Sequence, residues 1–134
     1  IPFRSNIKIY GNTIITADQN NVLNIFNRLN GTQLKFIPTE ETTVKNDFIN
    51  SLALYKNTLI YLNTFGSLYS INSKNFQINW FANFKQSLDL DPTNLFYSNP
   101  VIISKDKIIV SNKVLVIKPL IIAKSIIMKV EISI

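Results

Sequence analysis

Two short acidic motifs are the places where this sequence could bind a metal or catalyse a reaction. Asp89 and Asp91 lie two residues apart and offer oxygen ligands, while Glu40 and Glu41 place two carboxylates side by side for acid–base work. A calcium loop needs roughly six to eight oxygens and often a turn glycine, and neither is evident here. Pro92 follows directly, as in a plain turn. A solvated turn is therefore the favoured interpretation of the Asp89 and Asp91 motif, and a solvated loop is the favoured interpretation of Glu40-Glu41.

The chain contains no cysteine and no histidine. This composition excludes disulfides, thiolate nucleophiles, zinc sites built from cysteine and histidine, and Ser-His-Asp catalysis. No partner residues for the acidic pairs are identifiable. We therefore predict no catalytic residue, no cofactor-binding residue and no metal ligand in this chain.

The net charge of +6 and the sequence pI of about 9.6 leave two interpretations open. A basic protein can bind nucleic acid or an anionic membrane surface. Alternatively, lysine simply fills exposed positions, as the abundance of isoleucine, asparagine and lysine typical of an AT-rich genome suggests. The basic residues are scattered, with no run of four. This favours the second interpretation, and no nucleic-acid partner is expected.

The elements that would position any such residues follow from an internal repeat. Shifted by 45, residues 7–36 fall on residues 52–81 without a gap, and apolar positions stay in phase throughout. Asp18 and Asn63 occupy equivalent strand ends, which marks them as architectural. A third copy begins at a shift of 49, with 52–54 on 101–103. The identical pairs of the first shift are Tyr10/Tyr55, Asn12/Asn57, Thr13/Thr58, Ile15/Ile60, Leu23/Leu68, Asn27/Asn72, Asn30/Asn75 and Phe36/Phe81.

Each copy has the pattern of four short strands joined by hairpins. Turn signals stand at Gly11-Asn12, at 20–21 and 65–66, and at Asn30-Gly31 and 74–75. The third strands are expected at 22–27 and 67–72, and the fourth at 34–37 and 77–81. No segment has a convincing helical period, and 42–50, the best candidate, is short. Four hairpin-linked strands in 45 residues predict an all-β fold, a partial β-propeller of four-stranded antiparallel blades.

The segment 68–80 resembles the repeat of the PQQ-like (quinoprotein-type) propellers, roughly Leu-Tyr-Ala-Leu-Asp-Ala-x-Thr-Gly-x-x-x-Trp. Leu68, Tyr69 and Trp80 match in register, Asn72 stands in the aspartate position, and Phe76 replaces the turn glycine. The first copy matches at Leu23 and Gly31, with Asn27 in the aspartate position and Lys35 in place of the tryptophan. No Gly-His or Trp-Asp signature of the WD40 type is present.

The resemblance implies structural roles for the matching residues. Trp80 would dock between neighbouring blades and not stack on a ligand, because a large flat side chain buries much area there. Gly31 and Gly66 would be turn residues with positive φ, and Asn27 and Asn72, in the aspartate position, would be structural residues of the blades.

Two groups of proteins share this repeat, and the resemblance implies a function through each. The first is the non-catalytic BamB-type scaffold of outer-membrane β-barrel assembly, which binds a protein partner, the barrel-inserting subunit, and needs no cofactor. The second is the PQQ-dependent dehydrogenases, which carry a quinone and calcium. Degenerate copies and the absence of a cysteine pair favour the scaffold. Its place would be the periplasmic face of the outer membrane of a Gram-negative bacterium, with an upstream lipid anchor as the membrane attachment. A binding propeller for an unknown ligand is a third possibility.

The repeat divides the chain into expected blades at 7–50 and 51–98, a partial blade at 99–117, and a degenerate or truncated blade at 118–134. The last division rests on 118–124, which resembles 99–105 and looks like an opening strand that arrives too early. The chain does not begin with methionine, so we expect a propeller fragment of a longer protein. No uncharged stretch of eighteen apolar residues exists, and no transmembrane helix is expected.

Overall fold

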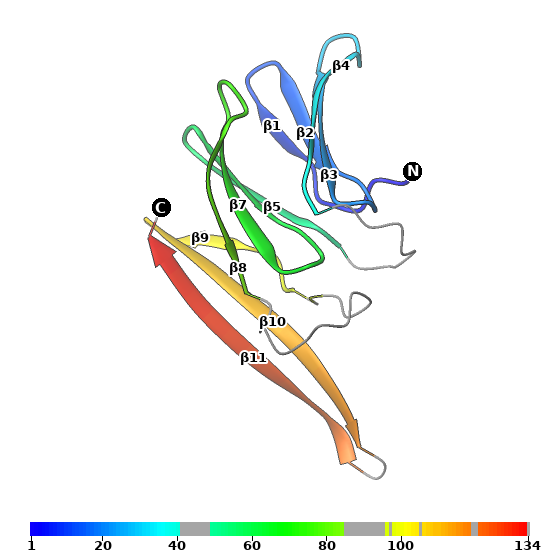
Figure 1. Cartoon of the computed structure of the whole chain (residues 1–134), viewed down its shortest axis with the longest axis vertical. Coiled ribbons are helices and arrows are strands. Elements are labelled where there is room, and N and C mark those ends of the chain that lie inside the picture. Colours follow the sequence, from blue (N-terminus) through cyan, green and yellow to red (C-terminus); the bar gives the residue numbers. More distant parts are fainter. Residues whose placement is uncertain (41–48, 85–95, 97, 105, 119–120, 134) are drawn as a thin grey trace.

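The computed structural model describes residues 1–40, 49–84, 96, 98–104, 106–118 and 121–133, and for 112–118 and 121–133 the backbone alone. Every regular element among these residues is a β-strand (Figure 1). The described part of the chain thus contains no helix that could span a membrane. Most of the helix candidate at 42–50, together with Glu41, Asp89 and Asp91, lies outside the described residues.

Two four-stranded antiparallel sheets repeat the same plan 45 residues apart. In each sheet the strands are ordered as they occur in the chain, so each is a simple meander. The first sheet comprises β1 (Lys8–Tyr10), β2 (Thr13–Ala17), β3 (Val22–Asn27) and β4 (Gln33–Pro38). The second comprises β5 (Ser51–Tyr55), β6 (Thr58–Leu62), β7 (Ser67–Asn72) and β8 (Ile78–Asn83). They lie within the spans 7–50 and 51–98.

The register of the two sheets is also equivalent. Thr13 pairs with Asn27 in the first sheet, and Thr58 pairs with Asn72 in the second. The ladder between the third and fourth strands shifts at Ile25/Phe26 and at Ser70/Ile71, again 45 residues apart. Two copies with different side chains therefore build one backbone, down to the position of an irregularity.

Three positions per sheet adopt left-handed backbone conformation, and these positions are equivalent as well. Gly11 (φ 56°) corresponds to Lys56 (φ 52°) in the turn between the first two strands. Asn21 (64°) corresponds to Gly66 (77°), and Gly31 (73°) corresponds to Phe76 (58°). Each pair contains one glycine, the residue that tolerates this conformation. The turns therefore require the left-handed conformation in both sheets, although only one residue of each equivalent pair is a glycine.

The third sheet departs from the blades expected at 99–117 and 118–134. It comprises β9 (Ile102–Ser104), β10 (Lys107–Lys118) and β11 (Ile121–Ser133), in the order β11-β10-β9. β10 and β11 form a long hairpin that reaches beyond the other sheets (Figure 1). Residues 121–133 thus pair within the sheet of β9 and do not open another. Isoleucine and valine, which favour strands, make up about half of β10 and of β11. The two strands are close along the chain, which favours a hairpin over a more distant pairing.

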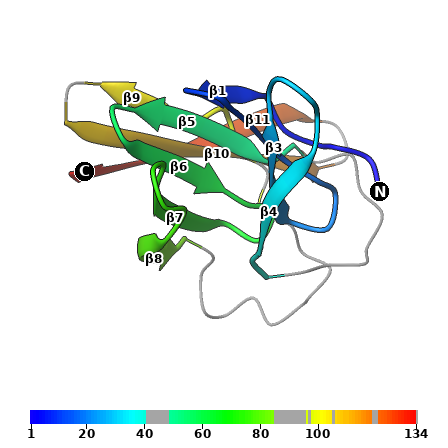
Figure 2. The ribbon, with the colours of Figure 1, turned by 90° about the horizontal axis from the view of Figure 1, so that it is seen from above.

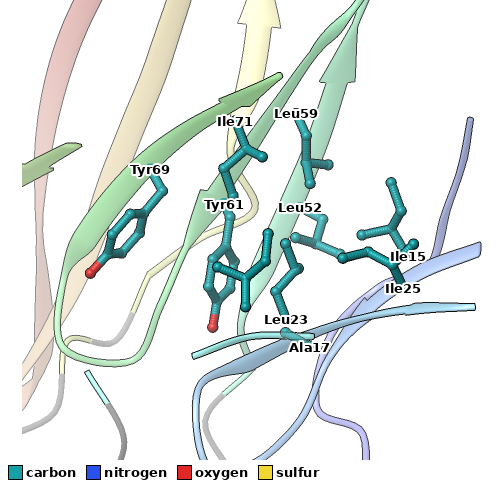
Figure 3. Packing of buried hydrophobic residues seen from close by; sticks show 10 residues of the cluster. Ile15, Ala17, Leu23, Ile25, Leu52, Leu59, Tyr61, Tyr69 and Ile71 are labelled. Carbon is teal, nitrogen blue, oxygen red and sulfur yellow. The ribbon is translucent and has the colours of Figure 1, made fainter. Parts of the chain in front are cut away.

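Two apolar clusters join the three sheets. The first lies between sheets one and two, where side chains of the two sheets face each other (Figure 3). The second lies between sheets two and three and includes Val101, Ile108 and Val110. Because successive side chains of a strand point to opposite faces, Leu59 and Tyr61 of β6 enter the first cluster while Ile60 and Leu62 enter the second. The middle sheet is therefore buried on both faces.

The first strand of the middle sheet, β5, contacts the first strands of both neighbouring sheets, β1 and β9. The outer strands β4 and β8 stand at the opposite side (Figure 2). The sheets thus pack face to face, with their first strands together on one side of the molecule. Blades in a propeller are arranged in the same way around a central channel.

Candidate functional site

Polar side chains gather where the second strand of each sheet, β2 or β6, ends. In each sheet one of these side chains holds the turn that leads to the third strand. Asp18 is buried, and its Oδ1 accepts hydrogen bonds from the backbone N–H groups of Asn20 (2.9 Å) and Val22 (3.1 Å). Asn63, its equivalent in the second sheet, accepts from the N–H groups of Phe65 and Ser67 at 3.0 Å each. A carboxylate and an amide perform the same task, so the task needs an acceptor and not a charge.

Asn21 joins the first two sheets. Its side chain is fully buried, and its Oδ1 accepts hydrogen bonds from the hydroxyl (2.9 Å) and the N–H (3.3 Å) of Thr64. Its Nδ2 donates to the carbonyl of Glu40 at 3.1 Å, and its own carbonyl accepts from the Thr39 hydroxyl at 2.6 Å. This residue ties the end of β4 to the second sheet.

Glu40 is exposed, but its carboxylate is engaged. Oε2 accepts hydrogen bonds from the Ser67 hydroxyl and from Nδ2 of Asn63, the latter at 3.2 Å. The Glu40-Glu41 pair predicted a solvated loop, whereas the structure brings Glu40 to a turn of the neighbouring sheet. Glu41 lies outside the described residues.

Asn50 and Tyr61 complete this polar end from inside the protein. Nδ2 of Asn50 donates to the carbonyl of Asp18 at 3.0 Å, and Oδ1 accepts from the Tyr61 hydroxyl at 3.1 Å. Burial raises the pKa of Tyr61 well above its usual range, with the nearby Asp18 charge adding to the effect. Burial and the Glu40 carboxylate also raise the pKa of Tyr69. Both phenols stay neutral at physiological pH.

The contacts between sheets recur from one interface to the next. Asn6 forms a pair of 2.8 Å hydrogen bonds with the backbone N–H and carbonyl of Leu52, and the Ser51 hydroxyl accepts from the N–H of Val101 at 2.8 Å. Asn6 and Ser51 are equivalent under the 45-residue shift, and Leu52 and Val101 are equivalent under the 49-residue shift.

A second contact recurs through tyrosine. The Tyr10 hydroxyl donates to Oδ1 of Asn57 at 2.6 Å, and the Tyr55 hydroxyl donates to Oδ1 of Asp106 at 3.4 Å. The two tyrosines are equivalent under the 45-residue shift, and the two acceptors Asn57 and Asp106 are equivalent under the 49-residue shift. The second interface therefore repeats the first in its polar contacts.

The residues singled out from the family resemblance lie in turns or in the packing between sheets. Trp80 on β8 is half-buried and packs against the cluster between sheets two and three. Gly66 lies against the Phe96 ring, which a Cβ added there would meet at 3.0 Å. A Cβ added at Gly31 would meet nothing within 4 Å.

Asn27 and Asn72 hold equivalent turns. Their Oδ1 atoms accept from the N–H groups of Leu29 and Lys74 at 2.8 Å each. Their carbonyls accept from the N–H groups of Gly31 (2.9 Å) and Phe76 (2.7 Å). In each copy the asparagine closes the turn on the left-handed residue.

Asn21 and Asn50, together with Thr39, Tyr61 and Thr64, are members of this polar end that sequence reasoning missed. Asparagine is so frequent in this chain that single residues attract little notice. The signal at Asn21 is its alignment with Gly66, because asparagine tolerates the left-handed region better than most residues. Within the described ranges no three acidic, histidine or cysteine side chains gather as a metal site would require. The geometry of this site serves to hold turns and to join sheets.

No family model matches the sequence, and no curated protein matches it. Solved structures do match. BamB from Moraxella catarrhalis has a TM-score of 0.57 at 6% identity, over 82% of this chain and 30% of that one. The quinohemoprotein alcohol dehydrogenase from Comamonas testosteroni has a TM-score of 0.60 at 12% identity, over 82% of this chain and 17% of that one.

A computationally designed protein, Ika4, matches with a TM-score of 0.61 at 10% identity. The match covers 83% of this chain and 60% of the designed one, so the chain spans less than two thirds of the length of each of these structures. Identities this low speak for the fold alone. Together with the four-stranded antiparallel sheets, they confirm the all-β fold predicted from the sequence: the chain folds as part of a β-propeller.

Proposed function

We propose that this protein is a non-catalytic scaffold of the BamB type, which binds a protein partner in the assembly of outer-membrane β-barrels. The fold is compatible with this function, since BamB is among the similar structures. The degenerate copies of the PQQ-like repeat and the absence of a cysteine pair support it further, because both features favour the scaffold over the dehydrogenases that share the repeat.

The observation that carries the proposal is the shared task of Asp18 and Asn63. Both accept two backbone N–H groups of a turn, although one is a carboxylate and the other an amide. Glu40 is likewise hydrogen-bonded across the sheets. A position that a carboxylate and an amide fill alike does not depend on the acidity of its side chain. The hydrogen bonds of these residues hold turns and join sheets, which supports a structural role for this end of the protein.

Exposed apolar side chains offer the means of contact. Ile78 and Phe81 of the outer strand β8 are 46% and 67% exposed, and Phe81 stacks on Tyr69 with ring centroids 5.9 Å apart. Aromatic residues fixed in this way are typical anchors of protein–protein interfaces. The partner proposed from the resemblance is the barrel-inserting subunit, met at the periplasmic face of the outer membrane.

A dehydrogenase function is the competing candidate. The quinohemoprotein alcohol dehydrogenase matches over the same share of this chain as BamB does. A protein of that class would bind PQQ with calcium and transfer electrons from an alcohol or a sugar to a dye.

Two measurements on the purified protein separate these functions. The first is binding to the soluble periplasmic domains of the barrel-inserting subunit, followed by biolayer interferometry. Saturable binding that Phe81→Ser weakens, while Leu29→Ser in the exposed β3–β4 turn does not, is the expected result. The second is dye reduction with an alcohol or a sugar after addition of PQQ and calcium. Quinone-dependent dye reduction, or no binding to the periplasmic domains, would overturn the scaffold proposal.

A further inference from the structure

The sequence contains one Asn-Gly pair, Asn30-Gly31, and it stands in the turn between β3 and β4. Glycine after asparagine favours an intramolecular reaction, because the backbone nitrogen of the glycine can attack the side-chain amide with no Cβ in its way. Asn30, Gly31 and Thr32 are all exposed, so water reaches the pair. This turn is therefore a candidate site of covalent modification, separate from the polar end described above.

The second sheet contains the same turn with a different residue after the asparagine. Asn75 is equivalent to Asn30 under the 45-residue shift and is also exposed, but Phe76 follows it. Gly31 and Phe76 both have left-handed backbone, with φ of 73° and 58°. The chain thus contains its own comparison site.

The side-chain amides of the two asparagines are held alike. Oδ1 of Asn30 accepts from the N–H of Thr32, and Oδ1 of Asn75 accepts from the N–H of Gln77, at 3.0 Å each. In the first turn the Thr32 hydroxyl also donates to Oδ1 of Asn30 at 2.8 Å. Attack on the amide places negative charge on this oxygen, and donors aimed at it stabilise that charge. The additional donor therefore favours reaction at Asn30.

The two attacking nitrogens are also engaged alike. The N–H groups of Gly31 and Phe76 donate to the carbonyls of Asn27 (2.9 Å) and Asn72 (2.7 Å). Each of these bonds must break before the nitrogen can attack, so local opening of the turn precedes reaction at either site. The side chain on the attacking residue separates the two sites, since Phe76 is half-buried against the first cluster and glycine has no side chain.

We propose that Asn30 is a site of spontaneous deamidation, in which the backbone nitrogen of Gly31 attacks Cγ of Asn30. The new bond from nitrogen to Cγ replaces the bond from Cγ to Nδ2, and ammonia leaves with the proton of the Gly31 N–H, which forms a cyclic succinimide. Water then opens the ring at either carbonyl and leaves aspartate or isoaspartate at position 30. Each product removes one unit of the +6 net charge. This reactivity needs no partner and does not depend on the scaffold function.

Peptide mapping by mass spectrometry on the purified chain, incubated at mildly alkaline pH, tests the proposal. Trypsin cleavage after Arg28 and Lys35 isolates Asn30 as the only asparagine of its peptide. We expect Asn30 to convert at least about tenfold faster than Asn75 in the same molecule, with isoaspartate among the products. Cation-exchange chromatography follows the loss of positive charge in the intact protein. Comparable rates at the two asparagines would overturn the proposal, and this comparison needs no variant.

Exchanging the residue after each asparagine separates the effect of glycine from that of the turn. Gly31→Phe should slow conversion at Asn30 by roughly tenfold, and Phe76→Gly should accelerate conversion at Asn75 by a similar factor. A Cβ added at Gly31 meets no atom within 4 Å, and Phe76 shows that phenylalanine can adopt this backbone conformation. Circular dichroism checks that every variant keeps its strand content.

Phe76→Ala is the matched control, because it removes the packing of the Phe76 ring but keeps a Cβ. Conversion at Asn75 should stay clearly slower in this variant than in Phe76→Gly. Equal rates in the two variants would contradict the proposal, since opening of the turn and not glycine would then set the rate. Unchanged conversion at Asn30 in Gly31→Phe would contradict it as well.

Discussion

Left-handed backbone is the residue-scale feature on which both complete sheets depend. Gly31 and Gly66 were predicted as turn residues from the family pattern, and the turns they occupy are left-handed. Lys56 and Phe76 could not be predicted in this way. No local preference places lysine or phenylalanine at positive φ, and the 45-residue alignment assigns the conformation to them through their glycine partners.

Replacing Lys56 by glycine is expected to stabilise the protein by about 0.5–1 kcal/mol, because glycine adopts positive φ without steric strain. Gly11→Ala, at the equivalent position, should destabilise by about 1 kcal/mol. No atom lies within 4 Å of a Cβ added at Gly11, so backbone strain alone would cause the loss. Urea unfolding measures both. Lys74→Gly, in a turn without positive φ at that residue, is the control and should not stabilise.

Asp18 provides a second residue-scale prediction. Asp18→Ala removes the acceptor for two backbone N–H groups and should lower the free energy of unfolding by about 1–3 kcal/mol. Asp18→Asn keeps one acceptor oxygen, as Asn63 does, and should lose clearly less. Thermal unfolding of the two variants is the comparison. Oδ2 of Asp18 also accepts from Nδ2 of Asn24 at 3.2 Å, a bond that Asp18→Asn would lose. Equal losses would therefore show that this second acceptor or the negative charge matters and that the analogy with Asn63 fails.

At the scale of elements, the 45-residue repeat predicted the strands where apolar residues recur in phase and where turn residues mark the strand ends. Ile60 and Leu68 were placed by the repeat, and their strands form as the phase of apolar residues predicts. The segment after residue 112 carries apolar residues without turn signals until Lys118-Pro119, so the sequence does not show which sheet it joins. The contact of Glu40 with Asn63 is long-range, and no local pattern encodes it.

Trp80 carries the prediction at this scale. It packs between sheets two and three, so Trp80→Ala should destabilise by about 2–3 kcal/mol, less than a fully buried tryptophan would cost. Lys35 holds the equivalent place in the first sheet and is exposed. Lys35→Ala should therefore change the free energy of unfolding by less than about 0.5 kcal/mol. Chemical denaturation monitored by circular dichroism avoids dependence on the tryptophan signal. Equal effects would argue against docking by Trp80.

At the scale of the whole molecule, the repeat predicted the number of strands in the first two blades and their order. It did not predict that the last strands of the chain, β10 and β11, pair with each other in one sheet. The first two sheets also share one buried cluster, whose largest fully buried side chain is that of Tyr61. Its ionisation would charge the interior of that interface, so the pH dependence of unfolding reports on the packing of both sheets.

The raised pKa of Tyr61 predicts loss of stability in alkali. An unfolded tyrosine ionises near pH 10.0, whereas the folded one stays protonated. The folded state thus binds more protons above that pH, and stability falls there by up to about 1.4 kcal/mol per pH unit. Below pH 10 this contribution is fully present. Tyr61→Phe should unfold with a shallower alkaline dependence, measured by urea titrations at several pH values. An unchanged slope would contradict the prediction.

The paired left-handed positions also show how the two copies could be combined into a single blade sequence. The first copy has glycine at positions 11 and 31, and the second has it at position 66, so the two copies together provide a glycine for each of the three turns. A blade recombined from the two, with glycine at all three turns, would contain no strained turn residue. Tandem copies of such a blade would be a natural starting point for engineering symmetric rings from this sequence.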